Sequence, residues 1–225
     1  PGTLTLAPPV AGNTYSGGTT VNGGTLLVTA GEGARTGSGS VVVNSGATLG
    51  GAGSIVGAVT LNAGAHLAPG FSIGSLDVGP LAITTDAILD FELDTIAGAD
   101  ISDLVNVRNV GGLTINGGTL NLTDAGNMTA GTYKLIEYDG SFNGSISDIE
   151  LGNVPAGFDF ELVDNSTTKS IDLVVTSTGD FNADGFANAA DYVTWRKGLG
   201  FTPGDYDDWK RNFGRTLMGG GASYD

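Results

Sequence analysis

The sequence has no cysteine, one histidine and few basic residues, and each shortage excludes a class of protein. Without cysteine, the fold uses no disulfides. Lysine and arginine number 9 against 24 aspartates and glutamates, giving a formal net charge of −15. This charge argues against nucleic acid or an anionic membrane as a partner, because both need basic side chains. No run of about 18 apolar residues occurs, so we expect no membrane span.

The acidic charge is unevenly placed along the chain. Residues 1–70 contain only Glu32 and Arg35 as full charges, so the excess acid lies beyond Phe71. No signal-peptide pattern is visible, and strand pattern begins almost at once, after Pro1. We interpret the chain as a mature or trimmed product.

We predict that the chain is not an enzyme. His66 occupies a repeat position where other copies carry Thr or Leu, which favours a packed or surface side chain over a general base. Parallel β-helix polysaccharide lyases need a basic residue among carboxylates, and residues 1–100 offer only Arg35. The acid pair Asp90/Glu92 is ordinary in so acidic a chain. A polysaccharide-binding or polysaccharide-cleaving β-helix is therefore the least favoured alternative.

What the sequence has in abundance is glycine, 39 of 225 residues, much of it in a recurring phrase of an apolar residue, Asn, a small residue and Gly. The phrase occurs as Val21-Asn22-Gly23-Gly24, Val43-Asn44-Ser45-Gly46, Leu61-Asn62-Ala63-Gly64 and Ile115-Asn116-Gly117-Gly118. The first intervals are similar in length, and the last, from Asn62 to Asn116, is three times the one from Asn44 to Asn62. Asn and Gly tolerate positive φ, so each phrase predicts a turn between strands. Strands and turns at a period of about 20 residues indicate a β-solenoid.

Strand-like runs flank these turns. We expect strands at residues 3–7, 19–21, 25–29, 40–43 and 59–61, and longer ones at 88–93, 104–107, 133–138 and 171–175. The longer runs alternate polar and apolar residues, as strands with one face in water do. We expect the solenoid to continue through residues 71–178 with larger coils. A β-sandwich over 71–178 is the alternative.

Two segments resemble a known family. The stretch GTLTLAPPVAGNTYSGGTTVNGGTLLV is similar to the autotransporter-associated β-strand repeat of bacterial surface-protein passenger regions. LAPGFSIGSLDV, residues 67–78, resembles the phrase that follows those repeats. Over residues 1–78 the resemblance implies a right-handed β-helix and an extracellular or cell-surface location.

A calcium-loop pattern follows the change in character at residues 178–179. Residues 180–191 match the EF-hand loop at positions 1, 3, 5, 6, 9 and 12. Side-chain oxygens would come from Asp180, Asn182, Asp184, Asn188 (directly or through water) and Asp191, and a carbonyl oxygen from Phe186, with Gly185 at the sharp turn. These hard oxygen ligands suit Ca²⁺. We therefore predict calcium as the cofactor of a small EF-hand-like helical domain.

Aspartate at position 12 makes this loop resemble the dockerin type I family. The pattern of residues from Asp191 to Gly200 is repeated, position for position, from Asp205 to Gly214. No second calcium loop precedes this second copy. The resemblance implies a possible protein partner, which the missing loop puts in doubt.

Two helices are expected in this region. Asn188 and Thr202 are candidate N-caps, and Pro203 suits the first helical position. The stripes Tyr192/Trp195/Leu199 and Tyr206/Trp209/Phe213 should face each other as a small core, with an aromatic ligand platform as the alternative.

The sequence thus predicts a β-solenoid over 1–178 (repeats in 1–70, longer strands in 71–178), a dockerin-like calcium module over 179–215 and a flexible tail over 216–225. We expect an extracellular structural or adhesive protein, part of a bacterial surface fibre or stalk. A dockerin-type protein-binding module is the alternative. The uncharged, Thr/Leu/Val-rich strand edge in residues 3–30 predicts end-to-end association into a homo-oligomer or filament.

Overall fold

The computed structural model describes residues 2–6, 13–29, 36–96, 98–108, 111–182, 186–197 and 203–214, and these are mainly β. Sheet A contains, in spatial order, β1 (Thr3–Leu6), β3 (Gly24–Val28), β5 (Ala47–Gly51), β8 (His66–Pro69), β11 (Ile88–Leu93), β16 (Gly118–Asp124) and β19 (Ile149–Leu151). Sheet B contains β18 (Phe142–Gly144), β15 (Leu113–Ile115), β10 (Leu81–Ile83), β7 (Val59–Leu61), β4 (Val41–Val43) and β2 (Thr19–Val21). Sheet C contains β20 (Phe158–Asn165), β21 (Ser170–Ser177), β17 (Gly131–Tyr138), β14 (Leu104–Val107), β9 (Ser75–Val78) and β6 (Ser54–Ile55).

The remaining elements are short. A small hairpin joins β12 (Thr95–Ile96) to β13 (Ala99–Asp100), a 3-10 helix η1 spans Ile146–Asp148, and the helices are α1 (Ala189–Arg196) and α2 (Pro203–Asn212). Neither helix in the described part of the chain has the length and apolar character needed to cross a membrane.

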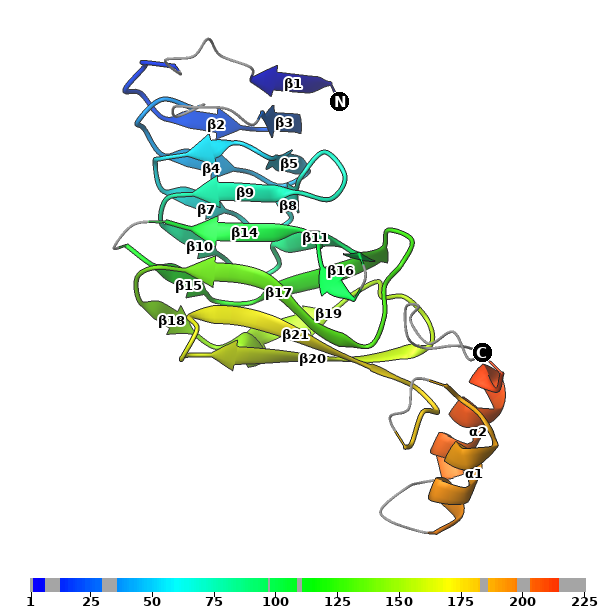
Figure 1. Ribbon diagram of the computed structural model, residues 1–225. Helices are drawn as coiled ribbons and strands as arrows, with labels where there is room; N and C mark the ends of the chain where they lie inside the picture. Colours follow the sequence, from blue (N-terminus) through cyan, green and yellow to red (C-terminus); the bar gives the residue numbers. More distant parts are fainter. Residues whose placement is uncertain are drawn as a thin grey trace.

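The chain winds through the three sheets in a repeating order. From β4 onward each turn places one strand in sheet B, the next in sheet A and the next in sheet C, so that successive turns stack (Figure 1). Neighbouring strands pair in parallel throughout sheets A and B and from β6 to β17 in sheet C. We call this body the coil stack. Parallel sheets of this kind are compatible with a β-solenoid.

Residues beyond 71 extend the same sheets. Strands β9, β10 and β11 pair directly with β6, β7 and β8, so residues 75–93 continue the coil stack. The expected larger coils are present up to β19, and no separate two-sheet sandwich forms among the described residues. The pattern changes only at β20 and β21, which pair antiparallel with each other, while β21 pairs antiparallel with β17.

The core consists of apolar columns that run through the stack. On sheet B the parallel register aligns Val21, Val43, Leu61, Ile83 and Ile115, all buried. On sheet A it aligns Leu26, Leu49, Leu67, Leu89 and Leu120, which are also buried. Because each coil places the same kind of side chain over the one below, the period in the sequence becomes a continuous apolar interior.

The recurring phrase follows the sheet B column, with one copy that the Asn pattern misses. Ile83 stacks between Leu61 and Ile115, and its coil reads Ile83-Thr84-Thr85-Asp86. The long interval between the last two copies of the phrase therefore holds a single intermediate coil, not the two that a strict period would place there. The step from Ile83 to Ile115 is the longer of the two, and the β12–β13 hairpin lies within it.

In the turns, glycine and not asparagine adopts the left-handed conformation that the sequence predicted for both. Glycine takes the positive φ, with 73° at Gly46 and 71° at Gly64, and Asp86 adopts 64° in the intermediate coil. Aspartate tolerates this conformation better than most residues. Backbone hydrogen bonds also link these turns from one coil to the next. The N–H of Gly46 donates to the Gly64 carbonyl, and the N–H of Gly64 donates to the Asp86 carbonyl, both at 2.8 Å.

Asparagine instead forms a side-chain ladder. Nδ2 of Asn44 donates to Oδ1 of Asn22, and Nδ2 of Asn62 donates to Oδ1 of Asn44, both at 2.7 Å. At the next coil Thr84 donates its hydroxyl to the Leu61 carbonyl at 2.8 Å. The amide side chains of these asparagines therefore form hydrogen bonds with the adjacent coil, and not with the turn of their own coil.

We predict that Asn44→Ala lowers the free energy of unfolding by about 1–2 kcal/mol, because it removes both ladder bonds of a half-buried side chain. Asn22→Ala removes one bond at an exposed position and should cost about half as much. Urea unfolding followed by circular dichroism measures both. Equal losses would show that the ladder contributes nothing beyond the turn itself.

Candidate functional site

The start of α1 is held by the reciprocal contact that the sequence predicts. The N–H of Ala190 donates to Oδ1 of Asn188 at 2.7 Å, and the N–H of Asn188 donates to Oδ2 of Asp191 at 2.7 Å. Aspartate thus replaces the usual glutamate of a capping box. Helix α2 begins at Pro203 as predicted, whereas Thr202 lies outside the described residues.

Asp191 is the anchor of the predicted calcium loop. Its side chain is fully buried, and its Oδ1 accepts a hydrogen bond from the N–H of Asn182 at 3.1 Å. The loop therefore folds back on this carboxylate from both sides, at Asn182 and at Asn188. No lysine or arginine of the described chain pairs with it.

The other predicted ligands are only partly placed beside Asp191. The Phe186 carbonyl accepts from Nδ2 of Asn188 at 3.3 Å, which brings positions 7 and 9 of the loop together. Asp184 lies outside the described residues, and within the described ranges no group of three acidic, histidine or cysteine side chains has the geometry to hold a metal ion. The oxygen donors of the loop suit a hard cation, but the full ligand set stays a prediction.

An acidic hollow lies where the helices meet the coil stack. Asp159 of β20, Asp180, and Asp205 and Asp208 of α2 line a space of about 280 Å³. Burial raises the pKa of Asp159, and the charges of Asp208 and Asp205 raise it further. Sequence reasoning missed this cluster because β20 and α2 are far apart along the chain.

The two aromatic stripes face each other as predicted. Tyr192 of α1 lies 5.1 Å from Trp209 of α2 between ring centroids, and Trp195 lies 5.0 Å from Tyr206. Phe213 packs edge-on against Trp209 at 5.0 Å. These rings form the core of the helical pair, while Leu199 lies outside the described residues.

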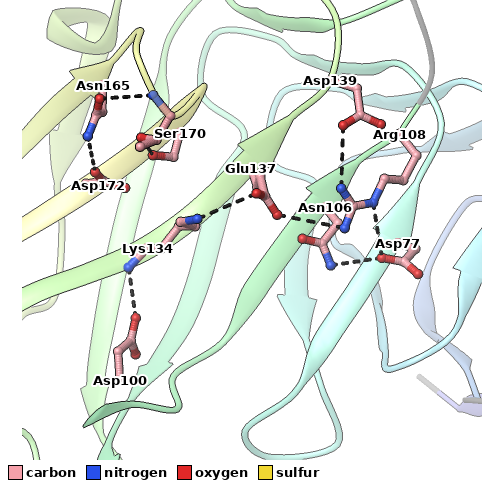
Figure 2. Close-up of polar contacts among 11 residues, drawn as sticks. Asp77, Asp100, Asn106, Arg108, Lys134, Glu137, Asp139, Asn165, Ser170 and Asp172 are labelled. Atoms are coloured by element: carbon pink, nitrogen blue, oxygen red, sulfur yellow. Dashed lines mark hydrogen bonds and ion pairs between the residues drawn. The ribbon is translucent and has the colours of Figure 1, made fainter. Parts of the chain in front are cut away.

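The outer face of sheet C carries a network of charged side chains (Figure 2). Arg108 lies among three carboxylates on the two turns that flank its own: Asp77 on the turn of β9, and Glu137 and Asp139 on the turn of β17. Its guanidinium is 3.9 Å from Asp77, 3.8 Å from Glu137 and 3.6 Å from Asp139. The parallel register places Asp77 and Glu137 on either side of Asn106, and Arg108, two residues further along the same turn, offsets the charge of these acids.

Asp103 is a buried carboxylate that joins two parts of the coil stack. Its Oδ1 accepts from the N–H of Gly74 at 2.9 Å and its Oδ2 from the N–H of Glu92 at 2.8 Å, and the residue is 1% exposed. Burial raises the pKa of Asp103 to about 7, against the lowering effect of the two backbone donors. The carboxylate clamps the loop of residues 70–74 to β11.

The structure places His66 at the surface of sheet A, one of the two placements that the sequence favours. Its side chain is half-buried, and its Nδ1 lies 2.7 Å from Oδ2 of Asp90. Asp90 also accepts from Nδ2 of Asn121 at 2.8 Å. The pair spans two neighbouring strands of sheet A.

Comparisons with known proteins support the autotransporter part of the resemblance. Residues 1–28 match the passenger-associated transport repeat. Over 174 residues the chain is 40% identical to the adhesin BmaC autotransporter of Brucella suis biovar 1 (strain 1330), a stretch that covers 73% of this chain. The same stretch covers 5% of that adhesin, so the chain spans a small part of its relative's length. The dockerin-like resemblance stays a prediction.

We predict that Asp103 makes the fold less stable as pH rises toward and through neutrality. Its folded-state pKa lies above the ordinary value, so its stabilising contribution is complete below about pH 4 and is lost as pH rises through about 7. Relative to Asp103→Asn, the wild-type chain should lose unfolding free energy between pH 5 and pH 8 in urea titrations.

The asparagine variant loses one hydrogen-bond acceptor, so its absolute stability does not test the prediction. The test is how the difference in unfolding free energy between wild type and variant changes with pH. Asp148→Asn, at an exposed carboxylate, is the matched control and should keep the wild-type pH profile. Parallel profiles for wild type and Asp103→Asn would overturn the assignment.

Proposed function

We propose that the chain is a segment of a bacterial cell-surface passenger protein, in which a β-solenoid has a structural and adhesive role. One observation carries the proposal: the coil stack begins within the residues that match the passenger repeat, and its register then continues unbroken to β19. The similarity to a protein named as an adhesin supports the adhesive part. A stack of coils suits a stalk, because each added coil lengthens the body without changing its cross-section.

The composition supports a non-enzymatic reading. The chain has one histidine and no cysteine, and His66 is committed to a surface pair with Asp90. The carboxylates on sheet A accept hydrogen bonds from neighbouring coils, as Asp90 does from Asn121. A structural role uses these groups to align coils.

We expect an antibody raised against the purified chain to label intact, unpermeabilised cells of the source organism, and external protease to remove the label. Microspheres coated with the chain should bind host-cell or matrix layers more strongly than microspheres coated with the urea-unfolded chain. Labelling that appears only after permeabilisation would overturn the surface location. Surface labelling without microsphere binding would leave a purely structural role.

A calcium-stabilised helical pair is a second candidate, favoured by the geometry at Asp191. The fully buried Asp191 carboxylate accepts hydrogen bonds from the backbone amides of Asn182 and Asn188, two residues of the predicted calcium loop. Asp180, Asn182, Asp184, Asn188 and Asp191 would bind the ion with the Phe186 carbonyl. The helical pair is small and its aromatic core is correspondingly modest, so even a small gain in stability from a bound ion would matter. Extracellular calcium modules bind at roughly 10⁻⁴ to 10⁻³ M.

We predict that millimolar Ca²⁺ stabilises the helical pair by about 0.4 to 1.4 kcal/mol. Chelation should change the fluorescence of Trp195 and Trp209 and leave the β circular-dichroism band intact. Asp184→Asn should weaken calorimetric Ca²⁺ binding at least about tenfold, and Asp207→Asn, on the exposed side of α2, should not.

Asp184 is the better test residue because Asn188 and Asp191 also hold the capping box, so their replacement would weaken α1 without any ion. Trp emission that is identical in calcium and in excess chelator would rule the proposal out.

Two partner predictions remain open. If the helical pair docks a partner protein, deletion of residues 180–225 abolishes partner binding; in the structural reading the deletion only weakens assembly. End-to-end association through the strand edge of β1 likewise stays a prediction, to be measured by light scattering.

A further inference from the structure

A groove of about 290 Å³ crosses the outer face of sheet A beside the loop of residues 70–74. This loop joins β8 to β9 and stands out from the side of the coil stack (Figure 1). Leu27 and Ala68 lie in the floor, Phe71 forms one wall, and Asp90 and Glu92 close the far side.

The apolar floor is closely packed around one residue without a side chain. The parallel register places Gly50 between Leu27 and Ala68 on successive coils. A Cβ at Gly50 would lie 2.5 Å from the Ala68 carbonyl oxygen and 3.2 Å from Cδ2 of Leu27. Only glycine fits there, because the Ala68 carbonyl and the Leu27 side chain already occupy the space beside Gly50.

The wall is an exposed aromatic ring on a loop that is held in place. Phe71 is 57% exposed, so its ring is accessible to a partner. Before the ring, Gly70 exchanges two backbone hydrogen bonds with Gly51, both at 2.9 Å. After the ring, Ser72 donates its hydroxyl to Oε2 of Glu92 at 2.9 Å, and the N–H of Gly74 donates to Asp103. Phe71 is therefore presented by a braced loop.

The far side of the groove is negative. The lining includes the carboxylates of Asp90 and Glu92 and no lysine or arginine. The nearby His66 pairs with one oxygen of Asp90 only, and the donors to Asp90 and Glu92 from Asn121 and Ser72 are neutral. The groove thus keeps a negative potential next to an apolar floor and an aromatic face.

We propose that this groove receives an arginine side chain of a partner protein. The aliphatic stem of arginine would lie over Leu27 and Ala68, its planar guanidinium against the face of Phe71, and its charge next to Glu92 and Asp90. Arginine combines an apolar stem with a weakly hydrated cation that stacks on aromatic rings, which matches these three surfaces together. The strong acid excess of the chain adds attraction for basic partners.

This proposal deepens the adhesive role and rests on it only for the partner being a protein. The test uses the whole chain and does not depend on where the chain resides, so surface labelling and groove binding fail separately.

The probe is the peptide acetyl-Gly-Gly-Arg-Gly-Gly-amide, compared with the same peptide carrying citrulline, the neutral isostere of arginine. Both are titrated into ¹⁵N-labelled chain and followed by amide chemical shifts. We expect saturable shifts at residues 70–74 and at Glu92 with the arginine peptide, and at least about tenfold weaker binding of the citrulline peptide. Raising the salt from 0.05 to 0.5 M should weaken the arginine peptide's binding further, through screening.

Glu92→Gln, which keeps the shape of the side chain, should weaken arginine binding at least about fivefold, and Phe71→Ala should do the same by removing the stacking face. Glu150→Gln, an exposed change of equal charge on β19 of the same sheet, is the matched control and should leave binding unchanged. If Phe71→Ala unfolds, Glu92→Gln and the citrulline peptide still decide.

Equal shifts from the arginine and citrulline peptides, shifts that map outside residues 70–74 and β11, or equal losses in Glu92→Gln and Glu150→Gln would each overturn the proposal. Saturable shifts at this groove from a neutral disaccharide such as maltose that persist at 0.5 M salt would assign it to saccharides instead.

Discussion

The coil stack depends on hydrogen bonds between backbones that belong to different turns of the chain. Each interior strand of sheets A and B contributes its N–H and C=O groups to the turn above and the turn below, and a buried group without such a partner would be costly. This requirement forces turns of unequal length, such as the short one from Val43 to Leu61 and the long one from Ile83 to Ile115, to keep the same register on sheet B. Extra residues are therefore placed between strands, as the β12–β13 hairpin is, and the ladders stay intact.

The sequence reveals this register wherever one residue type marks it. The runs predicted at 88–93 and 104–107 correspond residue for residue to β11 and β14, and the first alternates between buried and half-buried side chains along its whole length. The coil at Ile83 was not predicted because it lacks the Asn and Gly of the phrase. Thr84 replaces Asn and bonds to the Leu61 carbonyl, and Asp86 replaces Gly at the position of positive φ. The strand β8, which contains Ala68 and Pro69, has little strand propensity and forms because its neighbours supply the ladder.

Clusters assembled from separate turns left no signal in the sequence. Asp77, Arg108 and Glu137 belong to three turns, and only the parallel register makes them neighbours. The capping box, in contrast, is local to the start of one helix and was readable from Asn188 and Asp191 alone. Motifs within one segment can thus be predicted from the sequence of this chain. A surface formed by several coils can be predicted only once the length of each coil is known. The helical pair combines both cases, because its two aromatic stripes were legible and its contact with β20 was not.

Charge is graded along the axis of the coil stack. The first turns are almost neutral, whereas acids gather toward the last turns and the helices, with Asp159, Asp205 and Asp208 around one hollow. Such a body carries an electric dipole along its length. Within about 8 Å of an anionic surface at physiological salt, repulsion acts mainly on the helical end and exerts a torque on the whole rod. The neutral turns would face that surface, and the acidic end would point into the surrounding solution.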